Sequence, residues 1–278
     1  MPEQCWLVPH ASRKMWSDDC RNAVASESAF RQFRCLPGIR RVTENKPTKH
    51  AAALWQYVQD QCPQLCCFYP FLQKIDAIGS PLMADIDLER RLAPTTVGNF
   101  ADLAALNLCF GSLTGMNIVE IGAGYGSLAA MIAHVHKPAS YVIYDIPEAI
   151  ALQQKFLSAV GAKGVVHCTG MAPIRDQWDL VISDCALSEL DPPTRNQYAE
   201  LLLSRSLRGW IHWNSPPSET PGRITDPVAI LAWLWRTRQS HKATVRHGKY
   251  VSQYKNPLAA RHFFWGDNFT QVPPVTNA

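Results

Sequence analysis

The sequence lacks the features that mark a membrane protein, a secreted protein or a nucleic-acid-binding domain. No stretch approaches the roughly 18 uninterrupted apolar residues of a membrane helix, and the opening MPEQCWLVPH has no charged start followed by an apolar run. The formal charge of +4 is too mild to indicate a concentrated basic face. We therefore expect a folded cytoplasmic protein with no membrane span and no nucleic-acid partner.

The cysteines also lack a pattern that would indicate disulfides or a metal centre. There are 9 of them, an odd number, and no CxxC pair occurs. Cys62, Cys66 and Cys67 lie close together in the sequence, but a structural zinc site needs two properly spaced ligand pairs. We expect reduced thiols and no metal, although the sequence leaves open whether a divalent ion assists the chemistry.

The pattern of apolar residues divides the chain into four regions. Residues 1–50 are polar and interrupted by prolines, which predicts a loosely structured N-terminal arm. Residues 51–115 show helical spacing and predict a helical extension that contributes to the cover of the active site. Its second helix is expected to begin with Thr95 or Thr96 as N-cap and to end at Gly111. Residues 268–278 are expected to be a disordered tail.

Residues 116–267 carry short apolar runs that alternate with helical segments. NIVEIG, SYVIYDI, GVVHC, WDLVISD and GWIHWN predict five strands, and SLAAMIAHVH, EAIALQQKFLSAV and RNQYAELLLSRSL predict helices between them. A further helix is expected at VAILAWLWRTR, and last strands at KYVSQYKN and RHFFWGD. This order predicts an α/β fold with a doubly wound, Rossmann-like parallel sheet that helices cover on both faces.

The segment VEIGAGYGSL, residues 119–128, is the most informative motif. It lies where the first predicted strand ends and a helix begins, and glycines at 122, 124 and 126 let the backbone approach a ligand closely. A dinucleotide-binding turn has the spacing GxGxxG, whereas this one has GxGxG. Glu120 before the first glycine suits the cationic amino group of S-adenosylmethionine, and Asp145 after the second strand can accept hydrogen bonds from ribose hydroxyls.

We interpret this domain as an S-adenosylmethionine-binding catalytic domain, the cofactor leaving as S-adenosylhomocysteine. An NAD site and a domain that has lost its ligand are the alternatives. Since ligands lie at the carboxyl ends of parallel strands, residues after the later strands also belong to the expected site. The predicted cofactor-binding residues are Glu120, Gly122, Ala123, Gly124, Tyr125, Gly126, Asp145, Ile146, Gly170, Met171 and Asp184.

Four blocks of the sequence resemble the sugar O-methyltransferases of bacteria and their viruses, within the class I S-adenosylmethionine-dependent methyltransferases. They are IDAIGSP followed by APTT, VEIGAGYGSLA, YDIPEAIALQQKFLS and DLVISDCALSEL, and the similarity covers roughly residues 70–215. The resemblance implies methyl transfer to a hydroxyl of a sugar, either on a nucleotide or within a glycan. It also implies that Thr95 and Thr96 contact this substrate.

Methylation of a sugar hydroxyl benefits from a base, because the hydroxyl is a weak acid. Asp184, Glu189 and His212 are the candidates, since each lies in or just after a predicted strand. An O-methyltransferase for another small natural product and a catalytically silent cofactor-binding domain remain alternatives. The sequence leaves both a monomer and a homo-oligomer open.

Overall fold

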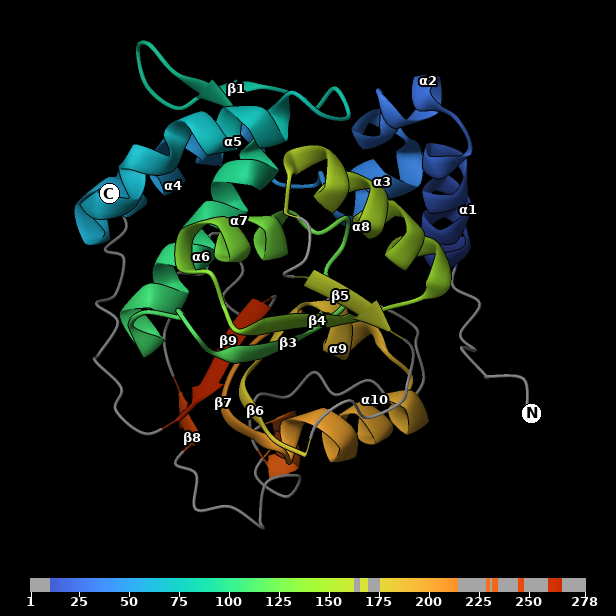
Figure 1. The fold of residues 1–278 in the computed structure, drawn as a ribbon, viewed down its shortest axis with the longest axis vertical. Helices are drawn as coiled ribbons and strands as arrows, with labels where there is room; N and C mark the ends of the chain where they lie inside the picture. The colour runs from blue at the N-terminus through green and yellow to red at the C-terminus, as the bar shows by residue number, and fades with distance from the viewer. Residues whose placement is uncertain are drawn as a thin grey trace.

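The computed structural model describes residues 11–162, 166–169, 176–214, 229–230, 232–234, 245–247 and 260–266 (Figure 1). Its main sheet has seven strands in the order β5-β4-β3-β6-β7-β9-β8. The strands are β3 (Asn117–Ile121), β4 (Ser140–Tyr144), β5 (Val166–Thr169), β6 (Trp178–Asp184), β7 (Ser206–Asn214), β8 (Val245–His247) and β9 (Ala260–Trp265). The five strands predicted from residues 116–214 are confirmed.

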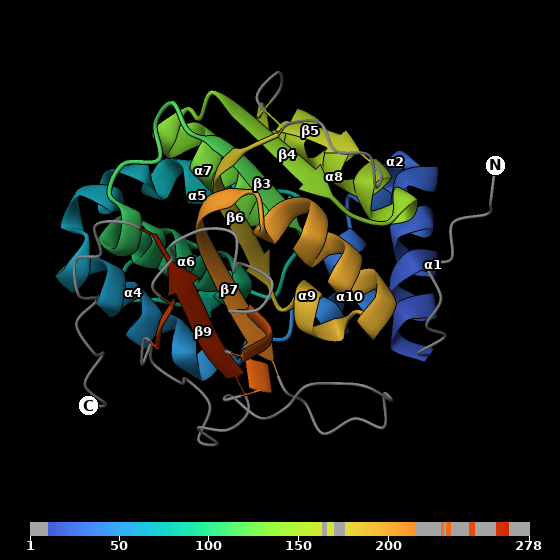
Figure 2. The same ribbon diagram turned by 90° about the horizontal axis from the view of Figure 1, so that it is seen from below.

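The first five strands of this sheet pair in parallel, whereas β9 runs antiparallel to both β7 and β8 (Figure 2). The segment RHFFWGD thus supplies a strand, as predicted. KYVSQYKN lies outside the described residues, as do the predicted tail at 268–278 and most of VAILAWLWRTR, of which residues 229–230 and 232–234 are helical.

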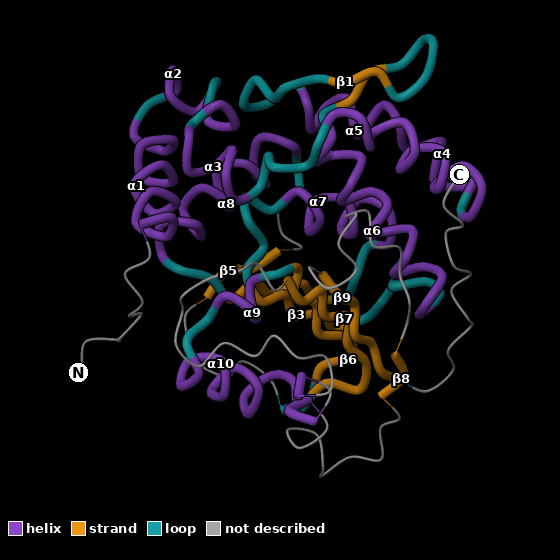
Figure 3. Tube along the Cα trace, turned by 180° about the vertical axis from the view of Figure 1, so that it is seen from behind, coloured by secondary structure: helices purple, strands orange, loops and turns teal. Residues whose placement is uncertain are grey.

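Helices cover both faces of the sheet, as predicted (Figures 1 and 3). On one face lie α6 (Pro94–Phe110), α7 (Ser127–His136) and α8 (Pro147–Val160), and on the other lies α10 (Pro192–Tyr198), which continues into a π-helical turn at Ala199–Leu203. Neighbouring strand residues alternate between the two layers, so that Ile118 joins the first core and Val119 the second. The helix predicted for RNQYAELLLSRSL ends early, because Ser206 already begins β7.

Local sequence explains where these helices begin and end. Asp191 caps α10 by accepting a hydrogen bond of 3.0 Å from the backbone N–H of Thr194. Pro147 occupies the first turn of α8, and the helix ends at Gly161 in the left-handed region. In α6 the predicted end at Gly111 is confirmed, but the predicted N-cap is wrong.

The N-cap of α6 is Ala93, and Thr95 and Thr96 lie inside its first turn. Pro94 explains the difference, because its fixed φ suits the first helical position and it needs no N–H partner there.

Residues 51–92 form α4 (Ala51–Gln61), a 3₁₀ segment (Pro63–Phe68), α5 (Tyr69–Asp76) and a two-stranded hairpin of β1 (Ala84–Asp85) and β2 (Arg91–Leu92). Among the described residues, no helix combines the length and apolar character that a bilayer crossing requires.

The expectation of a loose arm over residues 1–50 is wrong for the part that is described. Residues 11–50 form α1 (Ala11–Ala25), α2 (Glu27–Phe30) and α3 (Pro37–Val42), with 3₁₀ turns at Phe33–Cys35 and Thr48–His50. Trp16, Cys20 and Ile39 are buried in the same core as α6 and α8, and α1 packs beside α8 (Figures 1 and 2). This region is therefore an integral part of the fold.

The order of the strands locates the ligand-binding edge. From β3 the chain proceeds outward to β4 and β5, and then returns to place β6 on the other side of β3. In open α/β sheets ligands bind at such a switch point, beyond the carboxyl ends of the strands. The glycine-rich loop after β3 and the residues that end β6 meet at this edge.

Candidate active site

The glycine-rich loop adopts a conformation that side chains would prevent. Gly122, Gly124 and Gly126 have φ values of 70°, 58° and 97°, where L-residues with a Cβ are strained. A Cβ on Gly122 would also collide with the Cβ of Ala186, and one on Gly124 would lie 2.9 Å from the methyl group of Thr43. The loop is therefore held between the residues after β6 and the N-terminal region.

Asp145 follows β4 and is joined to this loop by hydrogen bonds. Its carboxylate accepts from the backbone N–H of Ala123 at 3.2 Å and from the side-chain amide of Gln153 at 2.7 Å. The same Gln153 amide donates to the carbonyl of Gly124 at 2.9 Å. The side chain of Asp145 accepts from its neighbour Ile146 as well, at 2.8 Å. Predicted residues from two strands are thus brought together in one rigid group.

Glu120 on β3, two residues before the first glycine of the loop, is a buried acid. The residue is 1% exposed and accepts a hydrogen bond of 2.7 Å from the phenol of Tyr141 on β4. Burial raises the pKa of the Glu120 carboxyl to about 8, and the nearby carboxylates of Asp184 and Asp145 add to this shift. Glu120 is therefore protonated at neutral pH in this state.

Asp184 and His212 form the second group, at the ends of β6 and β7. The two residues are register partners in the sheet, and Nδ1 of His212 lies 2.6 Å from Oδ1 of Asp184. The side chains are 28% and 11% exposed, so both are shielded yet accessible from one side. Two of the three candidate bases are thus hydrogen-bonded to each other.

Cys185 stands beside this pair in a strained conformation. Its φ is 66°, which is uncommon for a residue with a side chain, and its Sγ lies 3.4 Å from Oδ1 of Asp184 and 3.6 Å from Nδ1 of His212. Burial raises the pKa of the Cys185 thiol, and the charges of Asp184 and Glu189 raise it further. The group therefore contains a neutral thiol beside a carboxylate and an imidazole.

These three side chains are the described residues whose donor atoms come close enough together for a metal ion, all within 4.8 Å of one another. The separation of 2.6 Å between His212 and Asp184 is that of a direct hydrogen bond. Cys62, Cys66 and Cys67, which the sequence places close together, are free thiols.

The remaining predicted residues are placed differently. Glu189 ends the short helix α9 (Ala186–Glu189) and is exposed. Tyr125 is buried, and its phenol donates a hydrogen bond of 3.0 Å to Glu44. Gly170 and Met171 lie outside the described residues.

The hydroxyls of Thr95 and Thr96 bind within the protein rather than toward open space. Thr95 is 3% exposed and donates to the carbonyl of Thr43 at 2.8 Å, whereas Thr96 is fully buried and donates to Asp76 at 2.5 Å. Both hydroxyls thus make contacts within the protein, and their contact with a substrate stays a prediction. The two threonines hold the N-terminal region against α6.

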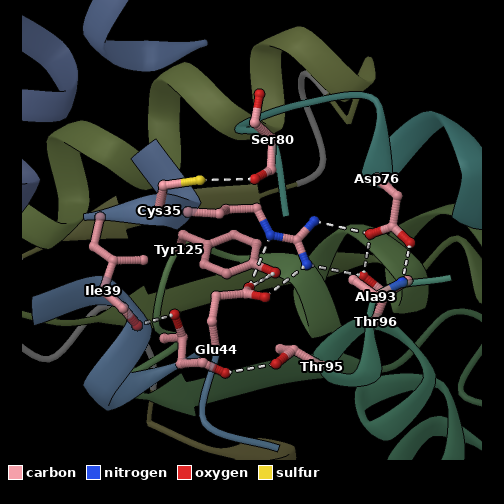
Figure 4. A network of polar contacts seen from close by, with 11 residues as sticks. Cys35, Ile39, Glu44, Asp76, Ser80, Ala93, Thr95, Thr96 and Tyr125 are labelled. Atoms are coloured by element: carbon pink, nitrogen blue, oxygen red, sulfur yellow. Dashed lines mark hydrogen bonds and ion pairs between the residues drawn. The ribbon is translucent and has the colours of Figure 1, made fainter. Parts of the chain in front are cut away.

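That attachment is completed by a buried ionic network, drawn in Figure 4. The guanidinium of Arg34 donates to Glu44 at 2.8 and 3.1 Å and to Asp76 at 2.8 Å. Arg34 is 1% exposed, and its two acidic partners keep it fully paired. Through Glu44 the network reaches Tyr125 in the glycine-rich loop. Sequence reasoning missed all three ionic residues, because none belongs to a local motif.

A second pair that the sequence did not indicate lies on the inner side of α6. Asp102 is 5% exposed, and burial raises the pKa of its carboxyl to about 6. Nζ of Lys46 lies 3.8 Å from Oδ2 of Asp102. The charge of Asp184 also raises the pKa of Asp102, and that of His212 lowers it.

The protein has a Rossmann-like methyltransferase fold with an N-terminal helical region. Its marks are the strand order, in which the antiparallel β9 lies between β7 and β8, and the glycine-rich loop after β3. No protein-family model matches the sequence. The protein-L-isoaspartate O-methyltransferase of Pyrococcus horikoshii is 32% identical over 87 residues, which cover 30% of this chain and 40% of that protein. The match thus spans less than half of this relative.

Two solved structures show similar folds at low identity. One is the magnesium protoporphyrin IX methyltransferase of Synechocystis with bound S-adenosylhomocysteine, with a TM-score of 0.47 and 17% identity over 61% of this chain and 82% of the other. The other is the O-methyltransferase NcsB1 from neocarzinostatin biosynthesis, with a TM-score of 0.42 and 11% identity over 64% of this chain and 58% of the other.

Proposed function

We propose that the protein is an S-adenosylmethionine-dependent O-methyltransferase that acts on a hydroxyl of a sugar. The observation that carries the proposal is the GxGxG loop at the switch point, hydrogen-bonded to Asp145 and packed against the end of β6. The three positive-φ glycines form a cradle that a Cβ would fill, and the carboxylate of Asp145 stands beside it as an acceptor for ribose hydroxyls.

When bound, S-adenosylmethionine supplies an electrophilic methyl group. The glycine-rich loop provides close backbone approach, and Asp145 fixes the nucleoside. The 32% identical stretch of an O-methyltransferase supports methyl transfer to oxygen. The sugar as acceptor is supported by the resemblance of residues 70–215 to sugar O-methyltransferases and awaits a direct test.

His212 is the base that the geometry favours. When the proton of its imidazole lies on Nδ1, it is donated to Asp184, and Nε2 carries the lone pair that can accept a proton from the acceptor hydroxyl. Asp184 then fixes the orientation of the ring and stabilises the imidazolium that forms. Glu189 remains the second candidate, but it is exposed at the end of α9.

The test is an acceptor screen with methyl-labelled S-adenosylmethionine. Free monosaccharides and nucleotide sugars form one panel, and isoaspartyl peptides, phenols and carboxylic acids form the other. We expect release of S-adenosylhomocysteine and labelled product with the sugar panel alone. Turnover of the second panel alone would contradict the sugar assignment, and cofactor binding without turnover on either panel would favour a catalytically silent domain.

A further inference from the structure

The segment that leads from α3 to α4 runs alongside the glycine-rich loop. The methyl group of Thr43 contacts Gly124, and the carboxylate of Glu44 accepts from the phenol of Tyr125. The carbonyl of Thr43 is bound by Thr95 at the start of α6. Residues 43 and 44 are thus fixed to both the loop and α6, and Lys46 follows two residues later.

Lys46 crosses α6 directly against Gly98, where the absence of a side chain leaves room for it. A Cβ on Gly98 would collide with the methylene groups of Lys46, which lie directly against the helix backbone. This path carries Nζ to 3.8 Å from Asp102 one turn further along α6. The side chain of Lys46 keeps 19% of its surface exposed, and the side chain of Asp102 keeps 8%.

The charge of Lys46 also acts on Cys185, the residue that follows β6. Cys185 precedes Ala186, which packs against Gly122 in the glycine-rich loop. Thr43, three residues before Lys46, contacts Gly124 in the same loop, so the segment of residues 43–46 borders the loop. In the proposed complex this is the place of the amino-acid end of the cofactor, because the nucleoside end is fixed at Asp145 on the other side of the loop.

An α-carboxylate bound at this edge needs a cationic partner of its own. Burial and the charge of Asp184 raise the pKa values of the Asp102 and Glu120 carboxyls, so a further anion near these acids is unfavourable without such a partner. The cofactor would bring an α-carboxylate to these acids. Arg34 cannot neutralise it, since Glu44 and Asp76 already hold its guanidinium.

We propose that Lys46 binds the α-carboxylate of S-adenosylmethionine, that Asp102 and Gly98 position its ammonium, and that the segment of residues 43–46 forms one wall of the cofactor site. This inference rests on the proposed function, since it assumes that cofactor. It makes the N-terminal region a part of the binding site and not only a support for it.

Calorimetry with two ligands tests the proposal. S-adenosylhomocysteine has the carboxylate, and 5′-methylthioadenosine has the same nucleoside without the amino-acid end. Lys46→Met should weaken binding of S-adenosylhomocysteine about 10-fold or more, the usual loss of a hydrogen bond to a charged group, and leave binding of 5′-methylthioadenosine unchanged. Lys46→Arg should restore part of the loss, and Gly98→Ala should reproduce it by displacing an intact lysine.

The exposed Lys49→Met provides a matched control from the same segment and should bind both ligands normally. The double variant Lys46→Met with Asp102→Asn removes both charges, so that a loss of stability from an uncompensated Asp102 does not obscure the result. Equal weakening of both ligands, or unchanged affinity for both, would overturn the role of Lys46. Failure of the unaltered protein to bind S-adenosylhomocysteine would instead contradict the proposed function.

Discussion

The phenol of Tyr141 donates a hydrogen bond of 2.7 Å to the buried carboxyl of Glu120, across the pair of strands β3 and β4. Because the pKa of Glu120 is raised to about 8, this carboxyl is neutral where a cationic amino group would favour its anion. Cofactor binding is therefore expected to release protons near neutral pH, and affinity should rise as pH increases toward 8.

Proton release can be measured directly. Titrations with S-adenosylhomocysteine at pH 7 in buffers of different ionisation enthalpy should give different apparent heats, and Glu120→Gln should abolish this difference. Identical heats in all buffers for the unaltered protein would mean that Glu120 keeps its proton in the complex.

The same carboxyl should make stability depend on pH. Its pKa in the folded protein lies above the ordinary value of 4.5, so its favourable contribution is complete below about pH 4.5 and is lost as pH rises through 8. The unaltered protein should therefore lose stability relative to Glu120→Gln as the pH rises from 5 to 9. The difference in the free energy of unfolding between the two proteins should change by roughly 2–4 kcal/mol over this range. Urea unfolding at several pH values measures this, with the exposed Glu89→Gln as control.

Asp145→Ala should weaken binding of S-adenosylhomocysteine by about 1.5–3 kcal/mol, because hydrogen bonds to a charged group are lost. The change also removes the acceptor for Ala123 and Gln153, so a small fall in melting temperature should accompany it. Asp145→Asn keeps one acceptor oxygen and should retain more of the stability than of the affinity. An unchanged dissociation constant in both variants would place the ribose elsewhere.

Asp184→Asn and His212→Asn should each lower turnover about 100-fold or more, and His212→Asn should leave cofactor affinity nearly unchanged. In the proposed mechanism Nε2 of His212 accepts the proton and Asp184, hydrogen-bonded to Nδ1, orients the ring. Glu189→Gln is the matched comparison, and it should keep most of the activity. A large loss in Glu189→Gln with normal turnover in His212→Asn would reverse the assignment of the base.

Gly122→Ala should destabilise the fold by about 1–3 kcal/mol, because the new methyl group meets Ala186 and the φ of 70° strains any L-residue. Adding Ala186→Gly removes the collision but not the backbone strain, so it should recover only part of the loss. Chemical unfolding of the two variants separates these contributions. Full recovery in the double variant would mean that the backbone strain is negligible.

Most of the sheet could be predicted from the sequence, because each strand corresponds to a short run of consecutive apolar residues. Strands such as β3 and β4 are continuous apolar runs, and the positions of Gly122 and Asp145 follow from where each run ends. The N-terminal region was mispredicted for the opposite reason. Its helices α2 and α3 have 4 and 6 residues, which are too few to show a helical spacing of apolar residues. Arg34 is buried, although an arginine is normally expected at the surface.

The pairs of the candidate site could not be predicted because they depend on register and packing. Asp184 and His212 meet through the pairing of β6 with β7, 28 residues apart in the sequence. Lys46 and Asp102 meet because α6 presents a glycine beneath the lysine. Neither relationship leaves a signature in residue spacing, although the individual residues Asp184 and His212 were identifiable from the ends of their strands.

The central claim is that the site takes S-adenosylmethionine rather than a dinucleotide. Calorimetric titration of the unaltered protein with S-adenosylhomocysteine and, separately, with NAD tests it most directly. The account predicts saturable binding of S-adenosylhomocysteine and no heat from NAD, because the GxGxG loop and its acids suit an amino acid attached to a nucleoside. Tight binding of NAD with no heat from S-adenosylhomocysteine would contradict it.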